Sequence, residues 1–187
     1  ISPGGVGSGL YGMLIIAILT VFIAGLMVGR TPEYLGKRIG VSEITKVCLY
    51  ILVMPVLVLA GVGISTMLPS TLDSVSADGP HGFSDLIYAF TSASNNNGSA
   101  FAGFGADTPW FNMSLGFAML FGRFLPIVMV LGLAGDFAKQ RPAAETAGTL
   151  PTHRPQFVGL TVAIAIIVSA LTFLPTLVLG PLTEALS

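Results

Sequence analysis

The sequence predicts an all-α polytopic membrane protein with four transmembrane helices, one re-entrant pore helix and a filter loop, which together contain a span–pore–span unit. Hydrophobic residues make up 53% of the chain and charged residues only 9%, whereas soluble domains carry roughly 25% charged residues. A polar segment rich in glycine and asparagine, 92–110, interrupts this apolar background. Four apolar stretches reach the length of about 20 residues that a helix needs to cross a bilayer: 10–29, 47–68, 111–137 and 157–179.

The lysines and arginines predict how these spans are oriented. They gather in the segments 30–46 and 138–155, and none occurs between Val47 and Gly122 or after Arg154. The positive-inside rule then places loops 30–46 and 138–155 in the cytoplasm and loop 69–110 outside it.

The first cytoplasmic loop contains the segment RTPEYLGKR at 30–38. Thr31 is a good N-cap residue and Pro32 suits the first position of a helix. We therefore expect a short amphipathic helix here, exposed at the surface or in contact with a partner subunit.

The outer loop predicts a pore helix and a filter. The segment GFSDLIYAFTSAS at 82–94 is apolar but too short to span, which favours a helix that reaches half depth. The next residues, SNNNGSAFAGFG, would be the return loop. Irregular backbone is tolerated at membrane depth only when it is buried in protein or lines a water-filled cavity, and ion-selectivity filters are built this way. An ordinary outer loop with Asn/Gly turns is the alternative.

Gly98 is the strongest single candidate in this loop. Carbonyl groups that turn toward one axis need backbone angles that only glycine adopts freely. The amides of Asn96 and Asn97 would brace the loop or supply oxygen ligands, and Ser99 adds a hydroxyl. A loop without a carboxylate at its apex suits a monovalent cation better than Ca²⁺.

Arg123 is the only charged residue inside the third span before its end. It follows Phe111 by about 18 Å of helix, which places it deep in the bilayer. Arginines at such depth usually mark an ion path, and below a filter the charge would repel cations and prevent leakage. Two alternatives remain: the side chain snorkels to the cytoplasmic headgroups, or it pairs with an acid outside this chain.

Other functions find little support in the sequence. The net charge of −1 argues against a nucleic-acid surface. There is no P-loop, no phosphorylation sequence and no nucleophile beside a base, so we expect no catalysis by this chain alone and no organic cofactor. His81 and His153 are isolated, so no metal site is expected beyond that for a monovalent cation. The first residues suggest the interior of a longer polytopic protein.

Four segments carry a resemblance to a known family: GGVGSGLYGM, VGRTPEYLGKRI, SNNNGSAFAGFG and GRFLPI. Together they resemble the C-terminal third of the potassium-binding A subunits of bacterial Kdp potassium-transporting ATPases, in the superfamily of potassium transporters. The resemblance implies four parts: 1–46, the second span of repeat three with its cytoplasmic loop; 47–137, repeat four; 138–155, a cytoplasmic loop; and 156–187, a final transmembrane helix.

The resemblance also implies a function. Such a subunit binds K⁺ from the outside at a carbonyl filter, here Asn96, Asn97, Gly98 and Ser99. It passes the ion to a catalytic P-type ATPase subunit, in a complex with small accessory subunits in the bacterial plasma (inner) membrane. Arg123 would be the gate in the ion path, and Arg30 a candidate for coupling. A stand-alone potassium channel or symporter and a structural membrane scaffold are the alternatives. One filter loop forms only one side of a four-sided site.

Overall fold

The computed structural model describes residues 8–29, 31–77, 79–142 and 151–186. In this part of the chain, four helices are long and apolar enough to cross a membrane, which confirms the predicted all-α class with four spans. The elements are α1 (Gly9–Val28), β1 (Glu33–Tyr34), β2 (Lys37–Arg38), α2 (Val41–Thr66), α3 (Pro69–Leu72), α4 (Pro80–Ser94), α5 (Pro109–Lys139) and α6 (Pro155–Leu186).

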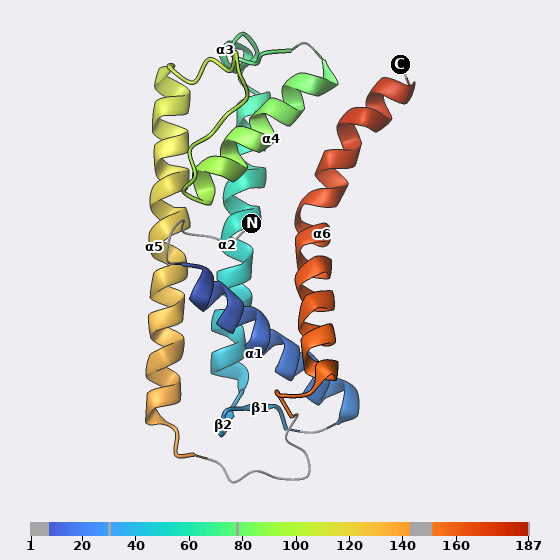
Figure 1. Cartoon of the computed structure of the whole chain (residues 1–187). Coiled ribbons are helices and arrows are strands. Elements are labelled where there is room, and N and C mark those ends of the chain that lie inside the picture. Colours follow the sequence, from blue (N-terminus) through green and yellow to red (C-terminus); the bar gives the residue numbers. More distant parts are fainter. Residues whose placement is uncertain (1–7, 30, 78, 143–150, 187) are drawn as a thin grey trace.

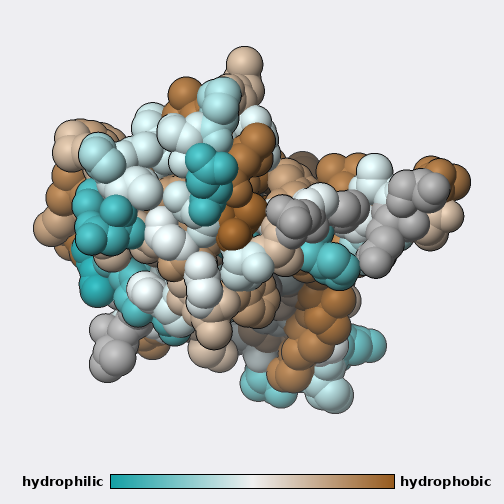
Figure 2. All heavy atoms as spheres, turned by 90° about the horizontal axis from the view of Figure 1, so that it is seen from above, coloured by the Kyte–Doolittle hydropathy of each residue, from teal (hydrophilic) through white to brown (hydrophobic). Residues whose placement is uncertain are grey.

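The long helices α2, α5 and α6 run along the same axis, and α1 crosses them obliquely near the end that carries the two strands (Figure 1). The short helix α4 begins near α3 at the opposite end and packs against α2, α5 and α6. We call these two ends the hairpin end and the α3 end. Figure 2 views the α3 end, where hydrophilic and intermediate residues cover much of the face and hydrophobic residues are interspersed among them.

Two glycines let α4 approach its neighbours closely. A Cβ atom on Gly122 of α5 would lie 2.0 Å from the carbonyl oxygen of Ser94, the last residue of α4. A Cβ atom on Gly61 of α2 would lie 2.3 Å from the ring of Phe90. Small residues of this kind allow helices in membranes to pack backbone against backbone. The position of α4 therefore depends on a glycine in each of the two flanking helices, α2 and α5.

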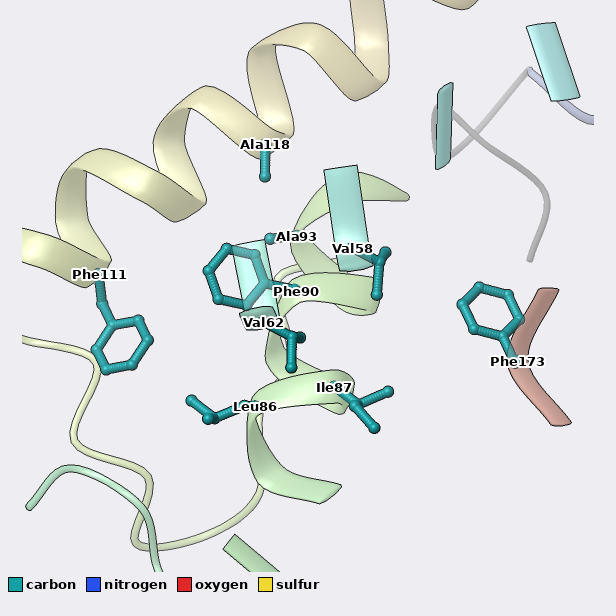
Figure 3. Close-up of a cluster of buried hydrophobic side chains, with 9 residues drawn as sticks. All are labelled: Val58, Val62, Leu86, Ile87, Phe90, Ala93, Phe111, Ala118 and Phe173. Atoms are coloured by element: carbon teal, nitrogen blue, oxygen red, sulfur yellow. The ribbon is translucent and has the colours of Figure 1, made fainter. Parts of the chain in front are cut away.

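The core around α4 is aromatic and aliphatic. Phe90 is 1% exposed, and its ring centroid lies 6.4 Å from that of Phe111. Within lipid, such a core is stabilised by close packing, because burial brings no gain over contact with acyl chains. Side chains from α2, α4, α5 and α6 form this cluster (Figure 3): Val58, Val62, Leu86, Ile87, Phe90, Ala93, Phe111, Ala118 and Phe173.

The spanning helices expose most of their apolar surface in this chain. Only 11% of the most apolar window of α6 is buried, and no more than 28% of that of α1 or α2. Exposed apolar faces on long helices are expected for contact with lipid or with other membrane segments. Together with the four spans, they identify a multi-pass membrane protein.

The expected amphipathic helix at 30–38 is wrong. Residues Glu33–Tyr34 pair antiparallel with Lys37–Arg38, and the turn between them has positive φ at Leu35 (50°) and Gly36 (73°). These angles are typical of a two-residue hairpin turn, which glycine favours. A helix of about two turns containing Pro and Gly would be marginal by itself. Arg30, the coupling candidate, lies outside the described residues.

The predicted loop 30–46 is also shorter than expected because α2 starts at Val41. Glu43 caps this helix: its Oε2 accepts a hydrogen bond from the backbone N–H of Gly40 at 2.9 Å. A carboxylate in this position satisfies a free amide at the helix start. The polar first turns of α2 therefore belong to the helix.

Candidate functional site

The polar turn at residues 95–99 lies near the middle of the long helices. The contact between Gly122 and the Ser94 carbonyl fixes the end of α4 at a point 13 residues into α5, or about 20 Å from its start. Since α5 has 31 residues, this point is close to its midpoint. The helix α4 thus descends from the α3 end to mid-length (Figure 1).

The segment after this turn returns to the α3 end. The backbone N–H of Gly105 donates to the carbonyl of Ser74, beside α3, at 2.7 Å. The next helix, α5, begins at Pro109, and the hydroxyl of Thr108 accepts from the N–H of Phe111 at 3.2 Å. The chain therefore enters and leaves through the same end of the helix bundle, and residues 95–105 form an irregular limb beside α4.

The backbone of the turn adopts conformations that explain its Asn/Gly composition. Asn96 has φ +62° and Gly98 has φ +86°, in the region that asparagine tolerates better than most residues and glycine adopts freely. The N–H groups of Asn97 and Gly98 both reach the carbonyl of Ser92, at 2.9 and 3.4 Å. A Cβ atom on Gly98 would meet no atom within 4 Å. Glycine is thus needed here for its backbone angles, and its outer side is open.

The asparagine side chains bind the protein scaffold. The Nδ2 group of Asn96 donates to the carbonyls of Ser94 and Met119, each at 3.2 Å. The Oδ1 atom of Asn97 accepts from the backbone N–H of Ser99 at 3.1 Å. Of the two roles left open by the sequence, these contacts favour bracing of the loop over direct ligation.

Arg123 contacts this turn directly. Its Nε donates to the Oδ1 of Asn96 at 3.0 Å, so the hydrogen-bond partner of the guanidinium among the described residues is a neutral amide. The preceding residue, Gly122, is the one that seats Ser94. The turn of α5 at Gly122 and Arg123 therefore packs closely against the end of α4 and forms a hydrogen bond to the loop that follows it. Whether Arg123 also controls ion passage stays a prediction.

Several carbonyl oxygens of the turn accept no hydrogen bond in the described part of the chain. Among the described residues, no hydrogen bond reaches the carbonyls of residues 96–99. The carboxyl end of α4, which carries the partial negative charge of a helix dipole, ends directly before them. Neutral oxygens beside such a dipole suit a monovalent cation that has lost part of its water.

Sequence analysis missed two residues of this network. The hydroxyl of Ser99 lies 2.8 Å from that of Tyr88 and 3.0 Å from that of Ser92. Positions 88 and 92 are one helical turn apart and share a face of α4. Two hydroxyl-bearing residues spaced four apart just before the Asn/Gly segment could have indicated that this face of α4 binds the loop.

A cavity of about 370 Å³ lies between α1, α2 and α6 and touches the site at Asn95. Its walls are mostly apolar, but they include Asn95 and Tyr50. In the described part of the chain, the Oδ1 of Asn95 and the hydroxyl of Tyr50 are buried without a hydrogen-bond partner. Groups buried in this way lose free energy unless water or another group satisfies them.

Comparison with known proteins identifies the family. A family described as potassium-transporting ATPase A subunit matches residues 1–186. Potassium-transporting ATPase potassium-binding subunits from Clavibacter michiganensis subsp. michiganensis, Mycobacterium avium and Kineococcus radiotolerans are 61%, 60% and 59% identical over the whole of this chain. The chain covers 34% of the length of each, and its place within that length stays a prediction. By this match over nearly its whole length, the chain belongs to the potassium-transporting ATPase A subunit family.

Proposed function

We propose that this chain is part of the potassium-binding, membrane-embedded subunit of an ATP-driven potassium uptake pump, in which it forms one side of the ion-selecting site. The ligands are the backbone carbonyls of Asn96, Asn97, Gly98 and Ser99. One observation carries this assignment: a polar turn is held at the mid-length of the spanning helices with its asparagine side chains bonded to the scaffold and its carbonyls uncommitted.

The relatives support the choice of ion, since they are named as potassium-binding subunits of potassium-transporting ATPases. K⁺ is the cargo and needs no organic cofactor. ATP hydrolysis takes place in a separate catalytic P-type ATPase subunit, and small accessory subunits complete the complex. Because a cage that replaces the hydration shell of K⁺ needs oxygens from several sides, other segments of the full-length subunit supply the rest of the site.

Arg123 serves as a gate in this proposal. Its guanidinium is bonded to Asn96 and therefore lies beside the backbone that would coordinate the ion. A fixed positive charge there opposes the free passage of cations. Potassium that leaves the filter is then directed toward the catalytic subunit, and Arg30 is the candidate for coupling to it.

The proposed location is the bacterial plasma membrane. Lys37 and Arg38 of the hairpin, Lys139 at the end of α5 and Arg154 just before α6 lie at the hairpin end, so the positive-inside rule makes this the cytoplasmic end. Loops 30–46 and 138–155 then face the cytoplasm and loop 69–110 faces outward. The turn at 95–99 is reached from the outside, as uptake requires.

The test replaces Gly98 with Ser and with Asp in the full-length subunit, assembled with its ATPase partner. ATPase activity is titrated with K⁺, Rb⁺ and Na⁺. A side chain in the left-handed region costs about 1–2 kcal/mol, which corresponds to a rise of roughly 5- to 30-fold in the half-saturating K⁺ concentration if the strain is relieved by distortion of the site.

Gly79→Ser is the matched control, because Gly79 also has positive φ (66°) and open space around it but lies at the far end of α4. With ψ −142°, Gly79 lies in a region that is nearly restricted to glycine, so the substitution should lower stability at least as much and leave the ion dependence unchanged. If Gly98→Ser assembles and behaves like Gly79→Ser, the carbonyl site is elsewhere. Ion flux that continues without ATP and without the partner would instead favour a channel or symporter.

A further inference from the structure

We propose that Tyr88 is a specificity-determining positioning residue. It holds residues 99–101 of the filter loop against α4 and so sets the spacing of the carbonyls. The inference rests on the proposed function of residues 96–99. Tyr88 would not touch the ion. It acts through Ser99 and Phe101, and its effect should appear in the discrimination between K⁺ and Rb⁺.

A chain of hydrogen bonds carries the first half of the argument. The Tyr88 hydroxyl lies 2.8 Å from the Ser99 Oγ, which lies 3.0 Å from the Ser92 Oγ. Ser92 in turn donates to the Oδ1 of Asn97 at 3.4 Å. The same Oδ1 accepts from the N–H of Ser99. The hydroxyl of Ser99 thus makes two contacts with α4, whereas its carbonyl accepts no hydrogen bond among the described residues.

A contact between two aromatic rings also supports the proposed role of Tyr88. The rings of Tyr88 and Phe101 are stacked, with centroids 4.5 Å apart and planes inclined by 30°. Phe101 follows Ser99 by two residues, so Tyr88 contacts the loop at two nearby positions, by a hydrogen bond to Ser99 and by ring stacking on Phe101. A stacked arrangement of this type favours one orientation of the pair. The limb from Ser99 to Phe101 is therefore fixed in direction as well as in distance from α4.

Tyr88 has little role in the core that holds α4 in place. It is 38% exposed and is absent from the buried cluster, to which its neighbours Ile87 and Phe90 belong. Removal of its hydroxyl leaves that packing intact. Because K⁺ and Rb⁺ are discriminated by small differences in the size and the number of coordinating oxygens, a slight shift of the Ser99 carbonyl is enough to alter the discrimination.

The experiment measures the ratio of the half-saturating Rb⁺ and K⁺ concentrations for ATPase activity of the complete complex. Tyr88→Phe removes the hydroxyl and keeps the ring, and Ser99→Ala removes the other partner. Each single variant should lower the ratio about 2- to 10-fold, the range expected for loss of one hydrogen bond. Ser99→Ala also loses the contact with Ser92, so the double variant should fall no further than Ser99→Ala alone, in which the Tyr88–Ser99 contact is already lost.

Tyr50→Phe is the matched control. Its hydroxyl is buried in α2 without a hydrogen-bond partner among the described residues, so the same chemical change should leave the ratio unchanged. Phe101→Leu tests the ring contact separately and should also lower the ratio. The unfolding temperature of each variant shows whether the fold is preserved.

An unchanged ratio in folded Tyr88→Phe, or a loss of maximal rate alone, overturns the inference, and so does an additive double variant. If Gly98→Ser raises the half-saturating K⁺ concentration while Tyr88→Phe leaves the Rb⁺/K⁺ ratio unchanged, the filter assignment is supported and the role proposed for Tyr88 is wrong. If neither variant changes the ion dependence, both fall. If Tyr88→Phe does not assemble, Ser99→Ala decides by the same ratio.

Discussion

Two polar networks join distant parts of this chain, one at the hairpin end and one at mid-length. At the hairpin end, Gln140 donates to the Oε1 of Glu43 at 2.7 Å and to the carbonyl of Arg38 at 3.0 Å, and Lys46 pairs with Asp136 at 2.5 Å. At mid-length, the network around the turn 95–99 consists of amides, hydroxyls and backbone groups, with Arg123 as its one charged member among the described residues.

The difference follows from the surroundings. Charged pairs at an exposed end compete with water and are screened by salt, so each contributes little. At membrane depth no water replaces a lost hydrogen bond, and each polar group must be satisfied by the protein or by a water-filled cavity. We therefore expect the hairpin end to tolerate substitution and the mid-length network to be sensitive to single atoms.

The largest effect is expected for Gly122→Ala. The new Cβ would lie 2.0 Å from the Ser94 carbonyl, which is backbone and can yield only if α4 moves as a whole. Overpacking of this kind costs about 1–3 kcal/mol and sometimes more, so the unfolding temperature and the yield of assembled complex should both fall. Gly116→Ala on the same helix meets no atom within 4 Å and should be neutral. Equal behaviour of the two variants would contradict the close contact.

A smaller effect, on function with the fold preserved, is expected for Arg123. Arg123→Lys keeps the charge but loses the Nε donor to Asn96, so the half-saturating K⁺ concentration should rise by a few fold, as for one lost hydrogen bond. Arg123→Gln also removes the charge and should permit Rb⁺ flux without ATP. Flux measurements on vesicles with the purified complex separate the two. If Lys and Gln behave alike, the charge is not the gate.

The smallest effect is expected at the hairpin end. Lys46→Met removes the ion pair with Asp136. The side chains of Lys46 and Asp136 are 26% and 24% exposed. The unfolding temperature should change little, and less still at high salt. The K⁺ dependence of ATPase activity should be unaltered. A large loss of ion affinity in this variant would remove the distinction between the two networks.

Part of the site was predictable from residue types alone. Gly98 was expected to adopt backbone angles that other residues resist, and it has positive φ; the positive φ of Asn96 was not predicted. The sequence left open whether the asparagine amides brace the loop or face the ion, because that depends on which acceptors lie nearby. Met119 and Arg123, which contact Asn96, belong to the following helix.

The prediction at 30–38 was wrong because local signals competed. Thr31 and Pro32 suggested a helix start, but Leu35 and Gly36 adopt a hairpin turn. The Lys37 ammonium donates to the carbonyl of Gln140 at 2.6 Å, and the Arg38 N–H donates to its side chain at 3.0 Å. These bonds come from the far end of α5. They support the hairpin through a contact that no local pattern contains.

The sequence by itself determined the class of the protein and its spans, because the length and hydropathy of a segment decide whether it can lie in a bilayer. It also identified Gly98 as a residue that needs unusual backbone angles. The tertiary structure alone decided that this turn stops at mid-length, that Gly122 receives the end of α4, and that Arg123 bonds to Asn96. These contacts join residues more than 25 positions apart, and their existence depends on which helix faces which, a property of packing that local composition does not encode.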